Sequence, residues 1–208
     1  MTSYSRTETL IGTALAPMDW TRTVSVVIAF SLFNALAAQF SLNIPISING
    51  LSFAIPITGQ SFAVTLTGAL LGSRLGALAL AAYIIEGSSG LPFFANSASG
   101  FGVLFGVTGG YIVSFPAAAY ITGAFAEHGW DRRFLTAAAA IAIGSVVILL
   151  AGWAWLVVLK TSPVNAFKAG VVPFIVGDII KVLLAAAVLP TGWAILKRKA
   201  SQAPGIKG

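Results

Sequence analysis

Asp178 and Lys181 are two ionisable residues inside one of the most apolar stretches of the chain, VVPFIVGDIIKVLLAAAVLP. Their spacing of i and i+3 places them on one face of a helix, close enough to touch. Together they present a hydrogen-bond acceptor and a donor, which suits a ligand with N–H groups and a carbonyl or carboxylate oxygen. The alternative is a structural pair that only neutralises itself and joins helices. Because ionisable residues within a membrane span are functional-site candidates by default, we expect these two to bind a ligand.

Asn96 is a further candidate, because its side chain both donates and accepts hydrogen bonds. It lies in the segment GLPFFANSASGFGVLFGVTGGY, in which glycine and serine break helical periodicity while four phenylalanines keep the segment apolar. We expect this segment to dip back into the protein as an ordered loop. The alternative for Asn96 is a turn residue that hydrogen-bonds to its own backbone.

Thr58, Gln60 and Ser61 lie at the start of the second predicted helix. Their polar groups could reach the same site. They could instead cap the helix, since Thr and Ser are favoured at helix N-termini. The sequence does not decide between the two.

Catalysis has little support in the sequence. The single His128 lies in the polar segment EHGWDRR, and the chain has no zinc-binding histidine pair, nucleophile elbow or phosphate-binding Gly-Lys-Ser/Thr loop. Without cysteine it forms neither disulfides nor thiolate metal sites. We therefore expect no enzyme, no catalytic residue, no metal and no cofactor. A membrane-embedded enzyme using Asp178 and Lys181 as acid and base is the less favoured alternative, because the same side of the membrane offers little else that titrates beyond Glu86.

The composition indicates an integral membrane protein. The 208 residues are 57% hydrophobic and only 9% charged, against about 25% charged in an average soluble domain. The apolar residues come in long runs, which predicts an all-α membrane fold rather than an outer-membrane barrel. The net charge of +6 comes from basic residues at segment ends, so membrane lipid is an expected partner and nucleic acid is not.

Hydropathy and helix breakers predict six transmembrane helices, over residues 24–41, 59–71, 75–85, 110–126, 134–159 and 173–196. We expect a single six-helix membrane domain over residues 21–199, a loose polar N-terminal tail over 1–20 and a short C-terminal tail over 200–208. The start of the first span, with Arg22 and the sequence Ala-Leu-Ala, also resembles a cleavable signal peptide. The later spans favour an uncleaved first helix.

Residues 42–58, LNIPISINGLSFAIPIT, have the pattern of a two-stranded ribbon. Isoleucines alternate with Pro45, Ser47 and Asn49 before an Asn-Gly pair, a strong short signal for a hairpin turn. Two prolines disfavour a helix, and an open ribbon is not stable against lipid. We expect this long first loop to lie at one membrane surface and to form a lid.

Lysine and arginine counts predict that both termini are cytoplasmic. The inner side then holds Arg6, Arg22, Arg74, Arg132, Arg133, Lys197, Arg198, Lys199 and Lys207, and the outer side Lys160 and Lys168. The ribbon, the Phe-rich loop and the start of the sixth span would share the outer side. We therefore expect one outward-facing site in a multi-pass protein of a bacterial cytoplasmic membrane.

The sequence resembles the BioY family, the biotin-capturing membrane subunits (S components) of energy-coupling-factor transporters. Five stretches carry the resemblance in the family's order: IPITGQSFAV (55–64), GALLGSRLGALAL (68–80), GSSGLPFFAN (87–96), GVTGGYIVSFPAAAY (106–120) and VPFIVGDIIK (172–181). The resemblance implies six helices, an outward-open pocket under the first external loop, and capture of biotin as a transported ligand. The chain departs from the family at Val107, where a proline is usual before Thr-Gly-Gly.

The resemblance places substrate-binding residues at Asn96, Asp178, Lys181, Tyr111 and Gln60, and Thr58 completes the candidate set. Biotin has a ureido ring with two N–H donors and a carbonyl, and an apolar tail that ends in a carboxylate. We expect Asp178 to accept from a ureido N–H and Asn96 to pair with the ureido edge. Lys181 meets either the biotin carboxylate or the ureido carbonyl. Capture of another vitamin, such as thiamine or riboflavin, is the alternative on the same architecture.

The resemblance also implies partner proteins, namely a coupling membrane protein (T component) and two ABC-type ATPases. Many capture subunits dock on the coupling protein through an Ala-x-x-x-Ala pattern in the first span. The nearest small pair here is Ser31 and Ala35. The sequence leaves open whether the chain works alone, as a homo-oligomer, or only with these partners.

Overall fold

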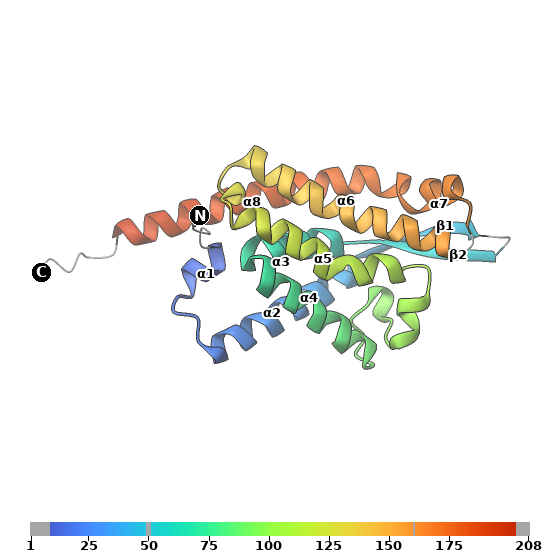
Figure 1. Ribbon diagram of the computed structural model, residues 1–208, viewed down its shortest axis with the longest axis horizontal. Helices are drawn as coiled ribbons and strands as arrows, with labels where there is room; N and C mark the ends of the chain where they lie inside the picture. Colours follow the sequence, from blue (N-terminus) through green and yellow to red (C-terminus); the bar gives the residue numbers. More distant parts are fainter. Residues whose placement is uncertain (1–8, 49–50, 160, 203–208) are drawn as a thin grey trace, which may run out of the picture.

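The computed structural model describes residues 9–48, 51–159 and 161–202. Its α-helices are α1 (Leu10–Ala14), α2 (Trp20–Gln39), α3 (Gln60–Leu71), α4 (Ser73–Ser88), α5 (Gly109–Ala126), α6 (Phe134–Val158), α7 (Pro163–Gly170) and α8 (Ile175–Gln202). The strands are β1 (Ser41–Ile48) and β2 (Leu51–Thr58), and the short 3-10 helices are η1 (Ala95–Ser97), η2 (Phe101–Phe105), η3 (Trp130–Arg132) and η4 (Val172–Phe174). Figure 1 shows a bundle with the hairpin at one end and the last turns of α8 projecting from the other.

Each of the six segments predicted as spans contains a helix, in order α2, α3, α4, α5, α6 and α8. Among the described residues, three helical runs are long and apolar enough to cross a membrane by length and composition: Trp20–Gln39, Phe134–Val158 and Pro163–Arg198. The last run joins α7, η4 and most of α8. Helix α3 is apolar but only 12 residues long. The chain is therefore a mostly helical membrane protein.

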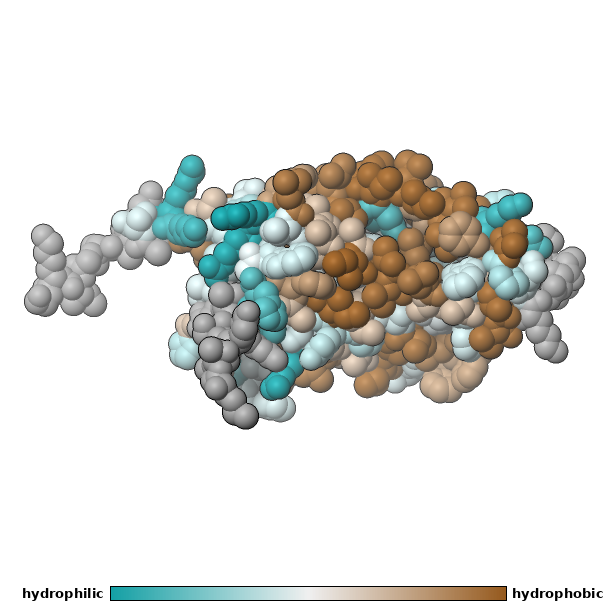
Figure 2. Space-filling model, turned by 45° about the horizontal axis from the view of Figure 1, so that its top comes forward, coloured by the Kyte–Doolittle hydropathy of each residue, from teal (hydrophilic) through white to brown (hydrophobic). Residues whose placement is uncertain are grey.

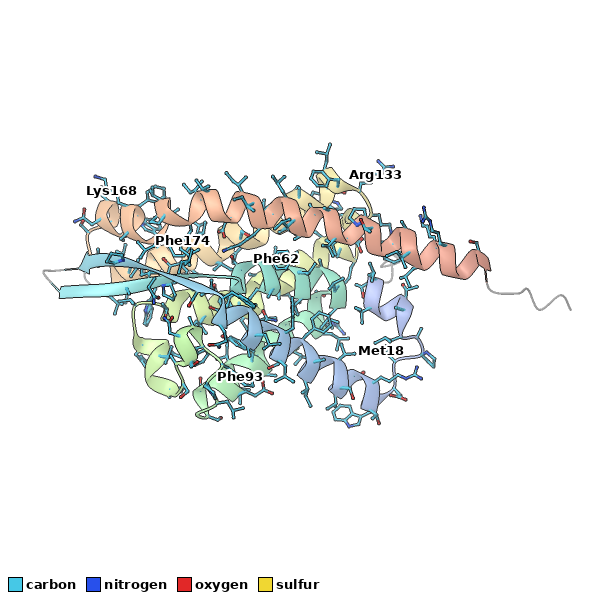
Figure 3. All side chains as sticks on the ribbon, turned by 180° about the vertical axis from the view of Figure 1, so that it is seen from behind. Met18, Phe62, Phe93, Arg133, Lys168 and Phe174 are labelled. Atoms are coloured by element: carbon cyan, nitrogen blue, oxygen red, sulfur yellow. The ribbon has the colours of Figure 1, made fainter. Side chains whose placement is uncertain are left out.

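The surface agrees with this assignment. Figure 2 shows an apolar band across the middle of the molecule, with hydrophilic residues gathered toward both ends. Exposed side chains of α6 and α8, such as Leu150 and Leu183, contribute apolar surface. Lys168 lies at the hairpin end, and Arg133 lies toward the opposite end of the helical bundle, from which α8 projects further (Figure 3). Of the residues used to predict the orientation, Arg6, Lys160 and Lys207 lie outside the described part of the chain.

Helix α5 lies at the centre of the bundle, where it contacts α3, α4 and α6. The approach to α3 is close because Gly68 leaves room for the backbone of α5. A Cβ atom at Gly68 would overlap the carbonyl oxygen of Ala119. Small residues at helix contacts are typical of membrane bundles, where packing replaces the hydrophobic effect as the force between helices. This contact fixes α3, whose first turn carries several of the candidate site residues.

The two-stranded ribbon predicted from the sequence is confirmed. β1 and β2 pair antiparallel from Ser41 opposite Thr58 to Ile48 opposite Leu51. The Asn49–Gly50 turn itself lies outside the described residues. At the base of the hairpin, the Gly59 N–H donates to the Phe40 carbonyl at 3.1 Å, which ties the end of α2 to the start of α3.

Part of the tail predicted over residues 1–20 is helical, and residues 1–8 lie outside the described part of the chain. Residues 10–14 form α1, because the Thr9 side chain accepts from the N–H of Gly12 and thereby caps the helix. Leu10 lies against Gly192 of α8, which gives the short helix an apolar contact. At the other terminus, α8 continues to Gln202, so the helix extends beyond the predicted domain boundary at residue 199.

The small pair Ser31 and Ala35 does not lie on the surface of the bundle. Ser31 is 0% exposed and Ala35 is 7% exposed. The Ser31 hydroxyl donates to the carboxylate of Glu86 in α4, so this face of α2 packs inside the bundle. The pair is therefore not accessible to a second protein.

We predict that Gly68→Ala destabilises the bundle, because α3 and α5 must separate to admit the new methyl group. Overpacking of this kind costs about 1–3 kcal/mol. The midpoint of thermal unfolding in detergent should fall by roughly 3–10 °C. Gly102→Ala is the matched control, because no atom lies within 4 Å of its added Cβ. Equal midpoints for the two variants would contradict the close packing.

Candidate ligand-binding site

A cavity of about 280 Å³ opens at the hairpin end of the bundle, between β2, α3, α5 and α8. Its volume lies near the lower limit of small-molecule sites, roughly 300–1,000 Å³. All six residues predicted for the site line the cavity: Thr58, Gln60, Asn96, Tyr111, Asp178 and Lys181. The apolar wall includes Ile55, Phe94, Ile112, Phe115, Ile148, Leu149 and Phe174. Their contact with a ligand stays a prediction.

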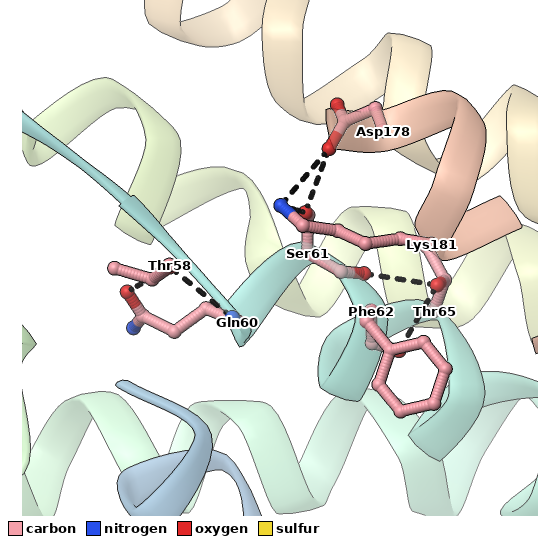
Figure 4. Close-up of polar contacts among 7 residues, drawn as sticks. All are labelled: Thr58, Gln60, Ser61, Phe62, Thr65, Asp178 and Lys181. Carbon is pink, nitrogen blue, oxygen red and sulfur yellow. Dashed lines mark hydrogen bonds and ion pairs between the residues drawn. The ribbon is translucent and has the colours of Figure 1, made fainter. Parts of the chain in front are cut away.

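Asp178, Lys181 and Ser61 form a closed ring of hydrogen bonds, shown in Figure 4. The Lys181 ammonium donates to Asp178 Oδ1 at 3.2 Å and to Ser61 Oγ at 2.9 Å. The Ser61 hydroxyl donates in turn to Asp178 Oδ1 at 3.0 Å. Asp178 is only 7% exposed, so its charge needs these partners. The ring thus joins α3 to α8.

Local sequence explains how these three groups meet. Asp178 and Lys181 are one helical turn apart in α8, on the face that is turned toward α3. Ser61 is the second residue of α3, directly after the base of the hairpin. The end of β2 therefore places the Ser61 hydroxyl beside the charged pair. Side chains from α3 and α8 together form one polar cluster.

The polar groups at the start of α3 also support each other. The Gln60 side-chain amide donates to the hydroxyl of Tyr83 at 2.6 Å, and that hydroxyl donates to the carbonyl of Phe93 at 3.1 Å. Thr58 donates to the Gln60 side-chain oxygen at 3.0 Å and accepts from the Gln60 backbone N–H at 3.1 Å. The Thr58 hydroxyl therefore satisfies an N–H group in the first helical turn, and the residue also lines the cavity.

Asn96 connects the Phe-rich loop to the hairpin. It adopts a left-handed backbone conformation with φ 57°, which Asn tolerates better than most residues. Its side-chain amide donates to Asn43 at 3.0 Å and accepts from Asn43 at 3.3 Å and from Ser41 at 2.9 Å. The side chain thus pairs with β1 instead of bonding to its own backbone.

Tyr111 closes another side of the cavity. Its hydroxyl donates to the Gly170 carbonyl at 2.7 Å, which links α5 to the end of α7. Its ring lies 5.9 Å from the ring of Phe174, an ordinary distance for interacting aromatic side chains. The Tyr111 hydroxyl therefore joins α5 to α7, and the residue lines the cavity.

The hydrogen-bond inventory defines what this site can bind. Among the described residues that line the cavity, Lys181 is the only cation, and it is already paired with Asp178. No described residue donates to Asp178 Oδ2, and one of the three Lys181 N–H donors has no partner in that part of the chain. The cluster offers one acceptor and one donor side by side, with an apolar wall beyond. A neutral group that carries both an N–H and a carbonyl fits this arrangement.

Sequence reasoning missed two kinds of residue. Tyr83 is fully buried in α4 and was not singled out, although a tyrosine in the middle of an apolar helix needs a hydrogen-bond partner and could have signalled the site. Ser61 was left open between a site residue and a helix cap, and its bonds to both charged groups were not predicted. Asn43 and Ser41 gave no signal, because their role depends on which loop the hairpin contacts. No cluster of three or more potential metal ligands is found among the residues that the structure describes.

Comparisons with known proteins agree on one family. A family model described as the BioY family matches residues 6–198. A probable biotin transporter BioY of Pyrococcus horikoshii is 38% identical over 160 residues, which are 76% of this chain and 88% of the relative. The biotin transporter BioY of Thermotoga maritima is 36% identical over 119 residues, covering 57% and 69% of the two chains.

A solved structure has a similar fold. It is the crystal structure at 2.1 Å of the S-component for biotin from an ECF-type ABC transporter. The match has a TM-score of 0.72 and covers 82% of this chain and 90% of that chain, at 21% sequence identity. At this identity the likeness concerns the fold.

We predict that Asp178 and Lys181 stabilise the bundle only as a pair. Lys181→Met or Asp178→Asn alone leaves an uncompensated charge between helices and should lower the thermal unfolding midpoint in detergent by roughly 3–10 °C. The double variant should lose less than the sum of the two single losses, because it leaves neither charge unpaired. Lys168→Met, at an exposed lysine, is the matched control. Additive losses would mean that the ion pair contributes nothing to stability.

Proposed function

The chain belongs to the BioY family, and on that premise we propose that it is the substrate-binding (S) subunit of a biotin transporter. It captures biotin from the outer side of the membrane for uptake into the cell. The observation that carries the proposal is the cavity that unites Asp178, Lys181 and Asn96 with an apolar wall. This combination suits a polar ring attached to an alkyl tail.

The hydrogen bonds among Asp178, Lys181 and Ser61 leave one acceptor and one donor without a partner in the described residues, and these two groups match the ureido group of biotin. Asp178 Oδ2 accepts from a ureido N–H, and the third N–H of Lys181 donates to the ureido carbonyl. The pairing of Lys181 with Asp178 at 3.2 Å favours this role over contact with the biotin carboxylate, since the ammonium charge is already neutralised. Asn96 is exposed where the loop meets the hairpin, and its amide pairs with the other ureido edge once it leaves Asn43.

We propose six membrane spans, formed by α2, α3, α4, α5, α6 and α8, with both termini cytoplasmic. The shorter helices α3 and α4 cross the membrane with the help of their neighbours. The hairpin then lies on the outer side as a lid, and Ile55 from β2 supports this because it is 2% exposed and packs with Phe174 at the cavity wall. The basic residues Arg132, Arg133 and Lys197 face the cytoplasm of a bacterial cell.

Energy for transport comes from partners in this proposal. The sequence has no phosphate-binding Gly-Lys-Ser/Thr loop, so ATP would be hydrolysed by two ABC-type ATPases and coupled through a T component. Because Ser31 and Ala35 are buried, the T component docks on a different surface. Co-purification from native membranes tests whether these proteins, or further copies of this chain, accompany it.

A membrane-embedded enzyme is the second candidate, since the Lys181 ammonium lies 2.9 Å from the Ser61 hydroxyl. A lysine activates a serine only in its neutral form, which has a lone pair for the proton. Here Lys181 donates to the Ser61 oxygen, and the Ser61 hydroxyl donates to Asp178 and not to the lysine. The geometry therefore favours ligand binding over nucleophilic catalysis.

We predict that the detergent-purified chain binds labelled biotin more tightly than thiamine or riboflavin at equilibrium. Biotin binding weaker than micromolar, together with tight binding of another vitamin, would reject the assignment to biotin. It would leave the S-subunit architecture in place, because the cavity exists with either ligand.

We also predict that Asp178→Asn weakens biotin binding by at least ~1 kcal/mol, or about fivefold, because the hydrogen bond to a charged acceptor is lost. Thr191→Val on the same helix is the matched control, since its hydroxyl donates to Ala187 and lies outside the cavity. An Asp178→Asn variant that folds and binds biotin with unchanged affinity would assign Asp178 a structural role only.

A further inference from the structure

Ser61 makes contacts that neither the sequence pattern nor the family match assigns. Its hydroxyl lies between Lys181 and Asp178 and is the only group from α3 that bonds to either charge in the described residues. We propose that Ser61 is a positioning and specificity-determining residue, which holds Asp178 Oδ2 and one Lys181 N–H toward the ligand so that the site selects a neighbouring donor and acceptor. This inference rests on the proposed function and adds a residue to its site.

The first step of the argument is the orientation of the carboxylate. Asp178 Oδ1 accepts two hydrogen bonds, one from Ser61 and one from Lys181. Both donors lie on the same side of the carboxylate, so the rotation about the Asp178 side chain is fixed. Oδ2 is then the oxygen that remains for a ligand N–H. A carboxylate held by Lys181 alone could turn and offer either oxygen.

The second step concerns the ammonium group. Lys181 has four side-chain carbons and several rotamers, so a single ion pair within the same helix restricts it weakly. Ser61 adds an acceptor from a different helix, 120 residues away in sequence, at 2.9 Å. Two acceptors restrict the rotation of the ammonium group more than one acceptor does. The third N–H donor, beside Asp178 Oδ2, is thereby restricted in direction.

The third step is the position of Ser61 in the fold. It is two residues after Gly59, the single residue between β2 and α3, and it lines the cavity together with Gln60. Gln60 is anchored to Tyr83 at 2.6 Å, which fixes the first turn of α3 against α4. The backbone that carries the serine is therefore held by two contacts, the Gln60–Tyr83 bond to α4 and the Gly59–Phe40 bond at the base of the hairpin. Such support from a second layer of residues is what keeps binding groups in a productive geometry.

Removal of the hydroxyl should change selectivity as well as affinity. In Ser61→Ala, Asp178 can rotate and a second Lys181 N–H becomes free, so the acceptor and donor no longer have a fixed relative position. A ligand that needs both groups then loses more than a ligand that uses only one. This differs from a purely structural role, which would weaken all ligands by the same factor.

The experiment compares biotin with its two carbamate analogues, in each of which one ureido N–H is replaced by a ring oxygen. We expect the wild-type chain to bind biotin at least about tenfold more tightly than the analogue that lacks the N–H facing Asp178. In Ser61→Ala this ratio should shrink by about threefold or more, with a loss of about fivefold in biotin affinity. Ser61→Thr, which keeps a hydroxyl, should restore most of the ratio.

A double-variant cycle provides a second readout. Ser61→Ala should cost less biotin affinity in the Asp178→Asn background than in the wild-type chain, because part of the effect of the serine runs through that carboxylate. Thr65→Val is the matched control, since it removes a buried hydroxyl one turn away in α3 that, within the described residues, bonds only to the backbone carbonyls of Ser61 and Phe62. Its ratio of affinities should equal that of the wild-type chain.

The outcomes separate this inference from the proposed function. A wild-type chain that does not bind biotin overturns the proposed function itself. A wild-type chain that binds biotin while Ser61→Ala keeps the wild-type ratio, or adds its full loss to that of Asp178→Asn, overturns only the role of Ser61. If Ser61→Ala does not fold, Ser61→Cys carries the same comparison, because it has nearly the same shape and a much weaker hydrogen bond.

Discussion

An aspartate and a lysine remain charged among apolar helices only while they are paired and hydrogen-bonded, and the site of this protein is built on that constraint. Desolvation of either charge alone would cost more than most single contacts in the bundle supply. Asp178 and Lys181 satisfy each other across one turn of α8, and Ser61 completes the ring from α3. The approach of these two helices is thus coupled to the polar chemistry of the cavity. Loss of one partner affects both the stability of the bundle and the ligand site.

Features that depend on residue type and spacing were predicted well. Long apolar runs place the helices, and the alternation of isoleucine with polar residues and proline in 42–58 predicts the hairpin that the structure shows. The i, i+3 spacing of Asp178 and Lys181 predicts their contact, which is observed at 3.2 Å. These predictions succeed because each rests on local geometry that tertiary contacts do not alter. Ligand contacts themselves remain predictions.

Features that depend on which face of a helix packs were not predictable from one sequence. In a membrane bundle both the lipid face and the packed face of a helix are apolar, so hydropathy does not distinguish them. Ser31 and Ala35 therefore looked like an accessible small pair, although the structure buries them. The partners of Tyr83 and Asn43 were not predictable either, because they depend on α4 lying beside Gln60 and on β1 lying beside Asn96. The helix α1 depends likewise on its packing against α8.

The hairpin is joined to the helical bundle by a short base with one connecting residue on each side. Only Phe40 separates α2 from β1, and only Gly59 separates β2 from α3. The Gly59 N–H donates to the Phe40 carbonyl and joins the two connections. A Cβ at Gly59 would come within 2.9 Å of the Ala37 carbonyl, so the joint is also crowded against α2. Strands of eight residues are roughly 25 Å long. Any rotation at this base would therefore displace the far ends of the strands much more than the hydroxyls of Thr58 and Ser61, which lie next to it.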